Sequence, residues 1–264
     1  MVRYALIATL CAALLAPSAY AETITIAADE WCPYNCAPGS DQPGFMIEIA
    51  REVLGKHGIS VNYVNVSWSR AISDTRKKKY DAIVGATTGD APDFVFPAVA
   101  QGFSAMGFYT APDSTWEYHN LDSLAGVSLG AIMDYSYSDE VDDYIKKNKN
   151  DRKLVQLVSG DKALLQNVKK LRSHRVDAII DDINVLSNFL ANTDQERSVR
   201  QAGTLSYKRG YAEQLIYVAF GPKQPKAKEY ARLMSKGTRE LRASGELQKI
   251  LDRYSVKDWK DIAE

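Results

Sequence analysis

The sequence has few of the residues that catalysis and metal binding usually require. It contains three histidines and three cysteines in 264 residues. The histidines, His57, His119 and His174, form no H-x-H or H-E-x-x-H pattern, and no group of His and Cys has the spacing of metal ligands. No nucleophile and base are paired by a recognisable motif. We therefore predict no catalytic residue, no metal and no cofactor.

The chain also lacks an excess of either charge, with 33 basic and 33 acidic residues. A nucleic-acid or anionic-membrane partner would require a basic surface, so neither is expected. Beyond the N-terminal region no stretch is apolar enough to span a bilayer, and no segment has low complexity. With 45% hydrophobic residues the chain is expected to be globular throughout.

Residues 1–21 have the pattern of a secretory signal. Arg3 supplies a positive charge, residues 4–15 are almost wholly apolar, and Ala19-Tyr20-Ala21 fits the small-x-small cleavage rule. The alternative is a membrane anchor, but the apolar run is shorter than the roughly 20 residues that a span needs. We therefore expect a soluble, exported product that begins at Glu22.

Two cysteines, Cys32 and Cys36, remain after the signal is removed. In an oxidising compartment an even pair this close together indicates a disulfide. The bond would fix the shape of the turn that the pair encloses. A redox-active pair is the alternative, but its usual spacing is C-x2-C, whereas this spacing is C-x3-C.

Strand and helix patterns alternate along the chain, which predicts parallel α/β sheets. Strands are expected at 23–27, 59–66, 81–85, 127–132, 154–158 and 177–180, with helices between them. The segments Asp81-Ala82-Ile83 and Asp177-Ala178-Ile179 echo each other, so we expect two similarly wound lobes. The first lobe would comprise 22–111 and 206–264, the second 112–205, and the chain would cross between them twice in extended form.

Several short motifs in a fixed order resemble the bacterial extracellular solute-binding proteins of family 3. They are the turn at 31–34, the helix start at 44–50, the pair 68–72 and 79–83, the segment 121–130 and the closing helix at 242–250. The resemblance covers nearly the whole mature chain. It implies the type II periplasmic-binding-protein fold, with two lobes that close on a small ligand.

This resemblance also implies the biological setting. Such proteins are periplasmic, act without catalysis, and deliver a polar or amino-acid-like ligand to an inner-membrane ABC permease. A monomer is expected because the cleft must be free to close. Two alternatives stay open: a sensory partner of a membrane receptor, and a dehydratase-like enzyme on the same fold that uses a cleft acid such as Asp29, Glu30 or Asp182.

One departure from the family concerns the ligand. Amino-acid binders of this type carry Thr-x-x-Arg after the third strand, and the Arg pairs with the ligand carboxylate. Here Ala91 stands at that place and no Arg follows Thr87 and Thr88. Arg70 could substitute from a neighbouring loop, or could form a surface ion pair. We therefore expect a ligand with a cationic or polar-neutral group and a ring or apolar part.

The candidate ligand-binding residues are aromatic, acidic or hydroxylated, and lie at the ends of the predicted strands, where ligands bind in open α/β sheets. They are Asp29, Trp31, Tyr34, Trp68, Arg70, Thr87, Thr88, Tyr135, Ser136 and Asp182. Each has a structural alternative. The aromatic rings could pack against the first helix, Ser136 could cap a helix, and Asp182 could cap the helix that follows it.

Overall fold

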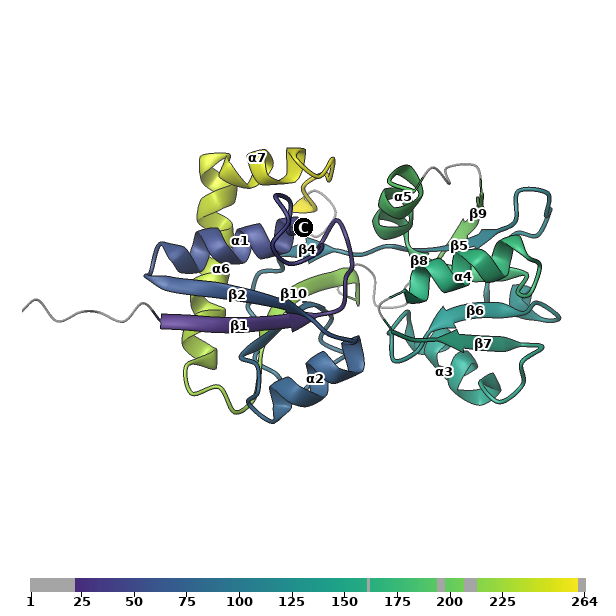
Figure 1. Ribbon diagram of the computed structural model, residues 1–264, viewed down its shortest axis with the longest axis horizontal. Helices are drawn as coiled ribbons and strands as arrows, with labels where there is room; N and C mark the ends of the chain where they lie inside the picture. The colour runs from purple at the N-terminus through teal and green to yellow at the C-terminus, as the bar shows by residue number, and fades with distance from the viewer. Residues whose placement is uncertain (1–21, 161, 194–197, 207–212, 261–264) are drawn as a thin grey trace, which may run out of the picture.

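The computed structural model describes residues 22–160, 162–193, 198–206 and 213–260, which form two five-stranded sheets. Figure 1 shows the two sheets side by side, each covered by helices. The first sheet has the order β2-β1-β3-β10-β4. Its strands are β1 (Glu22–Ala28), β2 (Ile59–Asn65), β3 (Ala82–Ala86), β4 (Gly102–Phe103) and β10 (Leu215–Phe220).

The second sheet repeats this plan, with the order β7-β6-β8-β5-β9. Its strands are β5 (Met106–Thr110), β6 (Leu129–Ile132), β7 (Val155–Val158), β8 (Ala178–Asp182) and β9 (Arg200–Thr204). In each sheet three parallel strands are followed by one that runs antiparallel to them, β10 in the first and β5 in the second. The last strand, β4 or β9, is antiparallel to that neighbour in turn. The predicted α/β class with two doubly wound lobes is confirmed.

Seven α-helices lie in the described part of the chain. They are α1 (Phe45–Gly55), α2 (Trp68–Arg76), α3 (Asp139–Asn148), α4 (Ala163–Arg172), α5 (Ile183–Ala191), α6 (Ala227–Ser244) and α7 (Glu246–Asp252), with a 3₁₀ turn at Leu121–Leu124. The C-terminal pair returns to the first lobe, where α6 packs on α1 and β10. Gly245, in the left-handed region at φ 80°, separates α6 from α7, because glycine adopts this conformation without steric cost.

The strand pairing differs from the predicted lobe boundaries at one point. β5 lies in the second sheet, hydrogen-bonded between β8 and β9, although it falls within the residues 22–111 assigned to the first lobe. The chain leaves the first sheet after β4, so Ser104 and Ala105 form the first crossing. The second crossing falls between β9 and β10, where 207–212 lie outside the described residues, as does the predicted signal 1–21.

Helices α1 and α6 approach each other closely at Gly237. A Cβ placed on Gly237 would lie 2.4 Å from Cγ1 of the buried Val53. Since Val53 is β-branched and packed in the core, it cannot move aside freely. Glycine at this position therefore sets the distance between the two helices.

We predict that Gly237→Ala lowers the free energy of unfolding. Overpacking costs about 1–3 kcal/mol, which exceeds the gain of about 1 kcal/mol in helix propensity. Chemical denaturation measures the change. Gly55→Ala is the matched control, because its Cβ meets nothing within 4 Å, and it should be neutral or stabilising. In the double variant Val53→Ala/Gly237→Ala the two costs should be less than additive; full additivity would contradict the close-contact explanation.

Candidate ligand-binding cleft

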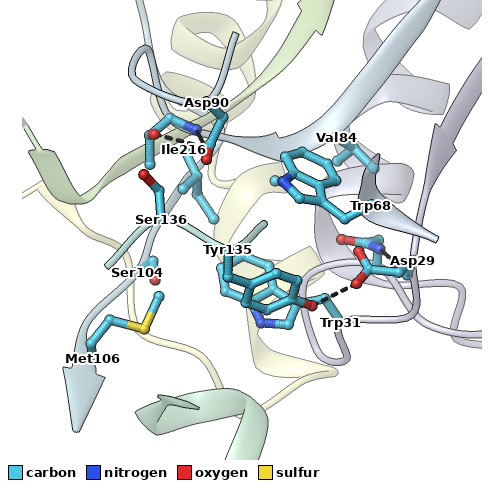
Figure 2. A pocket seen from close by; sticks show the side chains of 13 residues that line it. Asp29, Trp31, Trp68, Val84, Asp90, Ser104, Met106, Tyr135, Ser136 and Ile216 are labelled. Atoms are coloured by element: carbon cyan, nitrogen blue, oxygen red, sulfur yellow. Dashed lines mark hydrogen bonds between the residues drawn. The ribbon is translucent and has the colours of Figure 1, made fainter. Parts of the chain in front are cut away.

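Residues from both lobes line a small cavity of about 40 Å³ between the two sheets. Its walls are Asp29, Trp31, Asn35, Trp68, Val84, Gly85, Thr87, Asp90, Ser104, Met106, Tyr135, Ser136 and Ile216. They come from the ends of β1 and β3, the start of α2, the crossing after β4, and the loop between β6 and α3 (Figure 2). This is the place that open α/β sheets offer to ligands, beyond the carboxyl ends of their parallel strands.

Three aromatic side chains dominate the walls of this first cavity. Trp31 and Trp68 belong to the first lobe, and Tyr135 to the second. Trp31 stacks on Tyr34 with ring centroids 4.3 Å apart. It also covers Gly85, where a Cβ would lie 3.3 Å from the indole ring. The indole is therefore held between Tyr34 and β3 in the cavity wall.

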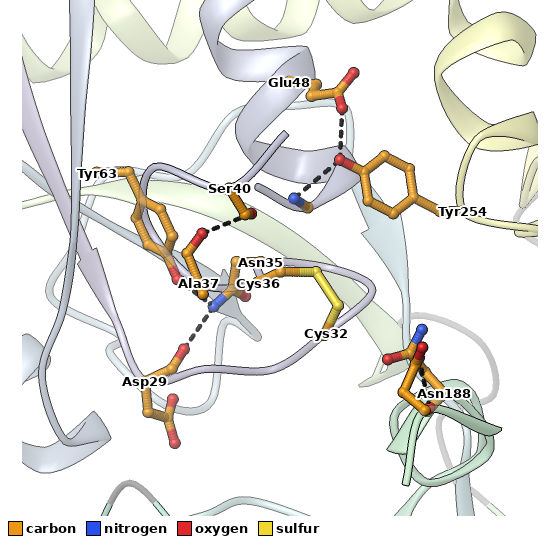
Figure 3. The surroundings of a disulfide bond; sticks show 12 residues. Asp29, Cys32, Asn35, Cys36, Ala37, Ser40, Glu48, Tyr63, Asn188 and Tyr254 are labelled. Atoms are coloured by element: carbon orange, nitrogen blue, oxygen red, sulfur yellow. Dashed lines mark hydrogen bonds between the residues drawn. A yellow bond between two sulfur atoms is a disulfide. The ribbon is translucent and has the colours of Figure 1, made fainter. Parts of the chain in front are cut away.

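The turn that carries Trp31 is fixed at both ends. Cys32 and Cys36 form the disulfide that the sequence predicts (Figure 3). Backbone hydrogen bonds join Trp31 and Asn35, with the Trp31 N–H donating to the Asn35 carbonyl at 2.8 Å. The buried Asn35 amide donates to the Asp29 carbonyl at 2.6 Å and to the Tyr63 hydroxyl at 3.0 Å. The turn is thereby tied to β1 and β2 before any ligand enters.

Asp29 and Tyr135 join the two lobes across the cavity. The Tyr135 hydroxyl donates to Asp29 Oδ2 at 2.6 Å (Figure 2). Burial, and then the charge of Asp29, raise the pKa of Tyr135 well above its usual value. The hydroxyl therefore stays protonated and remains a donor. A second bond between the lobes, from the Ser69 hydroxyl to Asp134, lies nearer the surface.

Asp90 is a wall residue that the sequence analysis missed. Its Oδ2 accepts hydrogen bonds from the Thr87 N–H and the Thr87 hydroxyl, both at 2.7 Å. Burial raises the pKa of Asp90 to about 6, and the charge of Asp142 in the opposite lobe adds to the shift. The signal was present in the sequence, since an acid three residues after a strand-end Thr can fold back onto its N–H.

On the facing lobe, Ser136 is turned toward α3. Its hydroxyl donates to Asp142 Oδ2 at 3.0 Å, and the Tyr137 N–H donates to Asp142 Oδ1 at 2.9 Å. The cap of α3 is Ser138, whose hydroxyl accepts from the Val141 N–H. Ser136 therefore lines the cavity without capping the helix, and it brings a carboxylate to this side of the cleft.

Asp182 lies outside the first cavity, fully buried, and caps α5. Its Oδ1 accepts from the Asn184 N–H at 2.8 Å and the Val185 N–H at 3.0 Å. Its Oδ2 accepts from Ser104, Ala105 and Tyr34, at 2.8, 3.1 and 3.1 Å. The structure thus shows the capping role, because Oδ1 accepts from two N–H groups in the first turn of α5.

Three more candidates lie away from the first cavity. Tyr34 is fully buried beneath Trp31, and its hydroxyl also donates to the Phe103 carbonyl at 2.7 Å. Arg70 and Thr88 are exposed. The charge of Arg70 acts on Asp74, one turn along α2, so Arg70 does not supply the missing carboxylate partner. The candidates that line the cavity are Asp29, Trp31, Trp68, Thr87, Tyr135 and Ser136.

Residues 24–91 match the model of the bacterial extracellular solute-binding proteins, family 3. A relative described as a probable histidine-binding protein of Campylobacter jejuni is 22% identical over 245 residues, which cover 87% of this chain and 83% of the relative. These matches support the predicted assignment to solute-binding family 3. The family is one of solute-binding proteins. Separately, no described helix is both long and apolar enough to cross a membrane.

Solved structures of the same fold cover most of the chain. One, from work on glutathione import by Streptococcus mutans, has a TM-score of 0.70 and 18% identity over 91% of this chain and 99% of its own. A histidine kinase sensor domain similar to periplasmic binding proteins has a TM-score of 0.69 and 16% identity. The match covers 88% of this chain and 95% of that domain. An arginine-binding protein mutant from T. maritima has a TM-score of 0.67 and 17% identity. The match covers 88% of this chain and 94% of that protein. The type II periplasmic-binding-protein fold is thereby confirmed.

We predict that Asp182→Asn destabilises the protein by about 2 kcal/mol. The asparagine can keep the two bonds that cap α5, but its NH₂ group would face the Ala105 N–H, so a buried donor loses its acceptor. Thermal unfolding monitored by circular dichroism measures the loss. Ser138→Ala, which removes only the cap of α3, is the control, with an expected cost of about 1 kcal/mol. An Asp182→Asn variant as stable as the wild type would show that the buried network contributes nothing.

Proposed function

We propose that this protein is a periplasmic solute-binding protein that closes on a small organic cation bearing a ring or apolar portion and delivers it to an inner-membrane ABC permease. The observation that carries this proposal is the Asp90 carboxylate in the first cavity. It occupies the N–H and hydroxyl of Thr87 that a ligand carboxylate would otherwise use. The protein thus holds an anion of its own at the anion-binding position.

The charges around the cavity favour a cation as the occupant. Asp29 and Asp90 lie in its walls, and Asp142 stands behind Ser136 on the opposite side. Within the described part of the chain, the residues lining this cavity include no lysine and no arginine. A carboxylate ligand would meet repulsion from these acids without a compensating base, whereas an ammonium or guanidinium group would be attracted to them.

The aromatic walls favour the same class of ligand. Trp31, Trp68 and Tyr135 present ring faces and edges to a small space. A cation over an aromatic face gains about 0.5–2 kcal/mol, and most when water is excluded. The same surfaces also bury the ring or hydrocarbon part of a ligand. Val84, Met106 and Ile216 complete an apolar floor.

Closure of the lobes would complete the site. Tyr135 and Asp29 already meet across it, and the first crossing, at Ser104 and Ala105, would serve as a hinge for rotation of the lobes. A monomer has the freedom that this motion needs. Delivery to a permease is favoured over sensing by the family match, and co-purification with a permease rather than a receptor would distinguish the two.

A thermal-shift screen of residues 22–264 tests the ligand class. We expect aromatic amines such as tyramine, and guanidines such as agmatine, to raise the melting temperature, because they bind the folded state alone. Glutamate and aspartate should give no shift. Trp68→Ala should abolish the shift, whereas Tyr80→Ala, which changes an aromatic residue outside the cavity, should retain it. Tight binding of glutamate or aspartate would contradict the proposal.

The role of Asp90 can be tested by removing its charge. In Asp90→Ala the N–H and hydroxyl of Thr87 are released, so we expect cation affinity to fall at least about tenfold and carboxylate ligands to begin to bind. Asp93→Ala, three residues further on, removes an exposed partner of Arg76 and should leave both affinities unchanged. Calorimetric titration with tyramine measures the cation affinity, and titration with glutamine measures the affinity for a carboxylate ligand. Equal cation affinity in Asp90→Ala and the wild type would remove Asp90 from the site.

Cation binding should also depend on pH through Asp90. A cation favours the ionised carboxylate, and the pKa of Asp90 is about 6 in the empty protein. Affinity for tyramine should therefore weaken as the pH falls from 7 to 5, and the weakening should be smaller in Asp90→Asn. An affinity that rises on acidification would be the opposite of this prediction.

A further inference from the structure

A second cavity, of about 400 Å³, lies on the other side of the Tyr135–Asp29 contact, against α4 and α5. It shares Asp29, Trp31 and Tyr135 with the first cavity. Figure 3 shows Asn188 of α5 on the far wall, facing the loop that carries the Cys32–Cys36 disulfide. The two cavities are therefore neighbouring compartments of one cleft.

The walls of the second cavity are apolar at the sides and acidic in part. Ile132, Leu164, Val185 and Phe189 supply the hydrocarbon surface. The charged residues around it are Asp29, Glu30, Asp181 and Lys162. Lys162 and Glu30 are exposed, whereas Asp181 is buried, with 2% of its surface accessible. The cavity thus combines an apolar lining with one deeply placed carboxyl group.

Only one of the two carboxyl oxygens of Asp181 has a hydrogen-bond partner among the described residues. Its Oδ1 accepts the Asp182 N–H at 2.8 Å, but its buried Oδ2 has no hydrogen-bond partner among the described residues. Most buried polar atoms do have partners, so an orphan that lines a cavity points to a missing ligand group or water. The first cavity leaves no comparable carboxylate oxygen: Asp90 Oδ2 is held by Thr87.

A second orphaned atom lies beside the first. Asp181 is paired with Gly107 across β8 and β5, and a Cβ on Gly107 would lie 2.8 Å from the Tyr109 hydroxyl. This hydroxyl is also buried without a partner, and the charge of Asp181 contributes to raising the pKa of Tyr109. The wall of the second cavity therefore contains an unpaired acceptor, and an unpaired hydroxyl on the neighbouring strand β5 is close enough to feel its charge.

We propose that the second cavity is a subsite for a protonated primary amine carried on a hydrocarbon chain or ring, with the Asp181 carboxylate as its anionic partner. The inference rests on the proposed function, since the two cavities share walls, and it extends the ligand to a molecule with a cationic end in each compartment. An organic cation is favoured over a metal ion, because no group of three or more His, Cys, Asp or Glu in the described residues has a metal-binding arrangement.

The protonation of Asp181 predicts a measurable property of this subsite, the release of a proton when a cation binds. Burial raises the pKa of Asp181 to about 8, and the charges of Asp182 and Asp29 act in the same direction. Glu30 and Lys162 lie at the rim with opposite charges, and the hydroxyls of Tyr109 and Tyr135 stay protonated. At pH 7 the empty site therefore holds a proton on Asp181. An incoming ammonium favours the carboxylate, so the proton leaves to solvent on binding.

The test uses 4-phenylbutylamine as the probe and 4-phenylbutanol as its uncharged counterpart. Calorimetric titration of residues 22–264 in two buffers of different ionisation enthalpy gives both the affinity and the protons released. We expect the amine to bind more tightly than the alcohol and to release close to one proton at pH 7. Its affinity should rise about fivefold from pH 7 to pH 8, as a group with a pKa of about 8 ionises. In this range Asp90 and Asp182, each with a pKa of about 6, are already ionised.

Two variants locate the effect. Asp181→Asn keeps the Oδ1 acceptor for the Asp182 N–H and should weaken amine binding at least about tenfold while removing the dependence on pH between 7 and 8. Asp252→Asn, an exposed carboxylate on α7, is the matched control and should behave as the wild type. Asn188→Phe adds bulk to the cavity wall without changing charge, and should weaken binding of the amine and the alcohol alike.

The outcomes separate this subsite from the proposed function. If the amine binds equally well to Asp181→Asn and is lost in Trp68→Ala, the first cavity holds it and the second subsite is overturned, while the proposed function stands. Absence of amine binding to the wild type, or equal binding of amine and alcohol, also overturns the subsite. If affinity falls as the pH rises from 7 to 8, the neutral Asp181 is acting as a donor and the assignment of a cation is wrong.

Discussion

The structure depends on one buried carboxylate, Asp182, where the two lobes, the first crossing and the aromatic turn meet. Its two oxygens accept bonds from the start of α5, from Ser104 and Ala105 in the crossing, and from Tyr34 beneath the turn. Each of these elements belongs to a different part of the chain. A single group therefore links the start of α5, the first crossing and Tyr34, the ring on which Trp31 stacks.

This use of Asp182 changes the chemistry of the cleft. An acid at the end of β8 would be available to a ligand ammonium only if it were free of the protein, and here its described bonds are to protein groups at both oxygens. The acids that face the cavities instead are Asp29, Asp90 and Asp181. The cleft therefore contains acidic groups without Asp182, and these groups lie in two compartments on either side of Tyr135.

The sequence predicts the fold well because the fold follows from local patterns. The helix at 45–55 and the three parallel strands of each sheet follow from hydrophobic periodicity. The disulfide follows from two closely spaced cysteines in a chain with the pattern of a secretory signal. Wall residues that stand beside a strand end, such as Thr87 and Trp31, could also be predicted. Ser104, Met106 and Ile216 could not, because they reach the cleft only through the way the crossings bring distant strands together. The pairing of β5 with β8, and the burial of Asp182 outside the first cavity, could not be predicted for the same reason.

The raised pKa of Asp181 gives the proposed cation a way to change the charge of the cleft. Burial disfavours the charged form of this carboxyl group, and the charges of Asp182 and Asp29 act in the same direction, so a proton neutralises it at pH 7. Asp90, whose pKa is about 6, is by contrast mostly ionised at that pH. The proposed cationic ligand would pair with the Asp90 carboxylate in the first cavity and would displace the proton of Asp181 in the second. Selectivity against anions would then follow from the carboxylates that line both cavities.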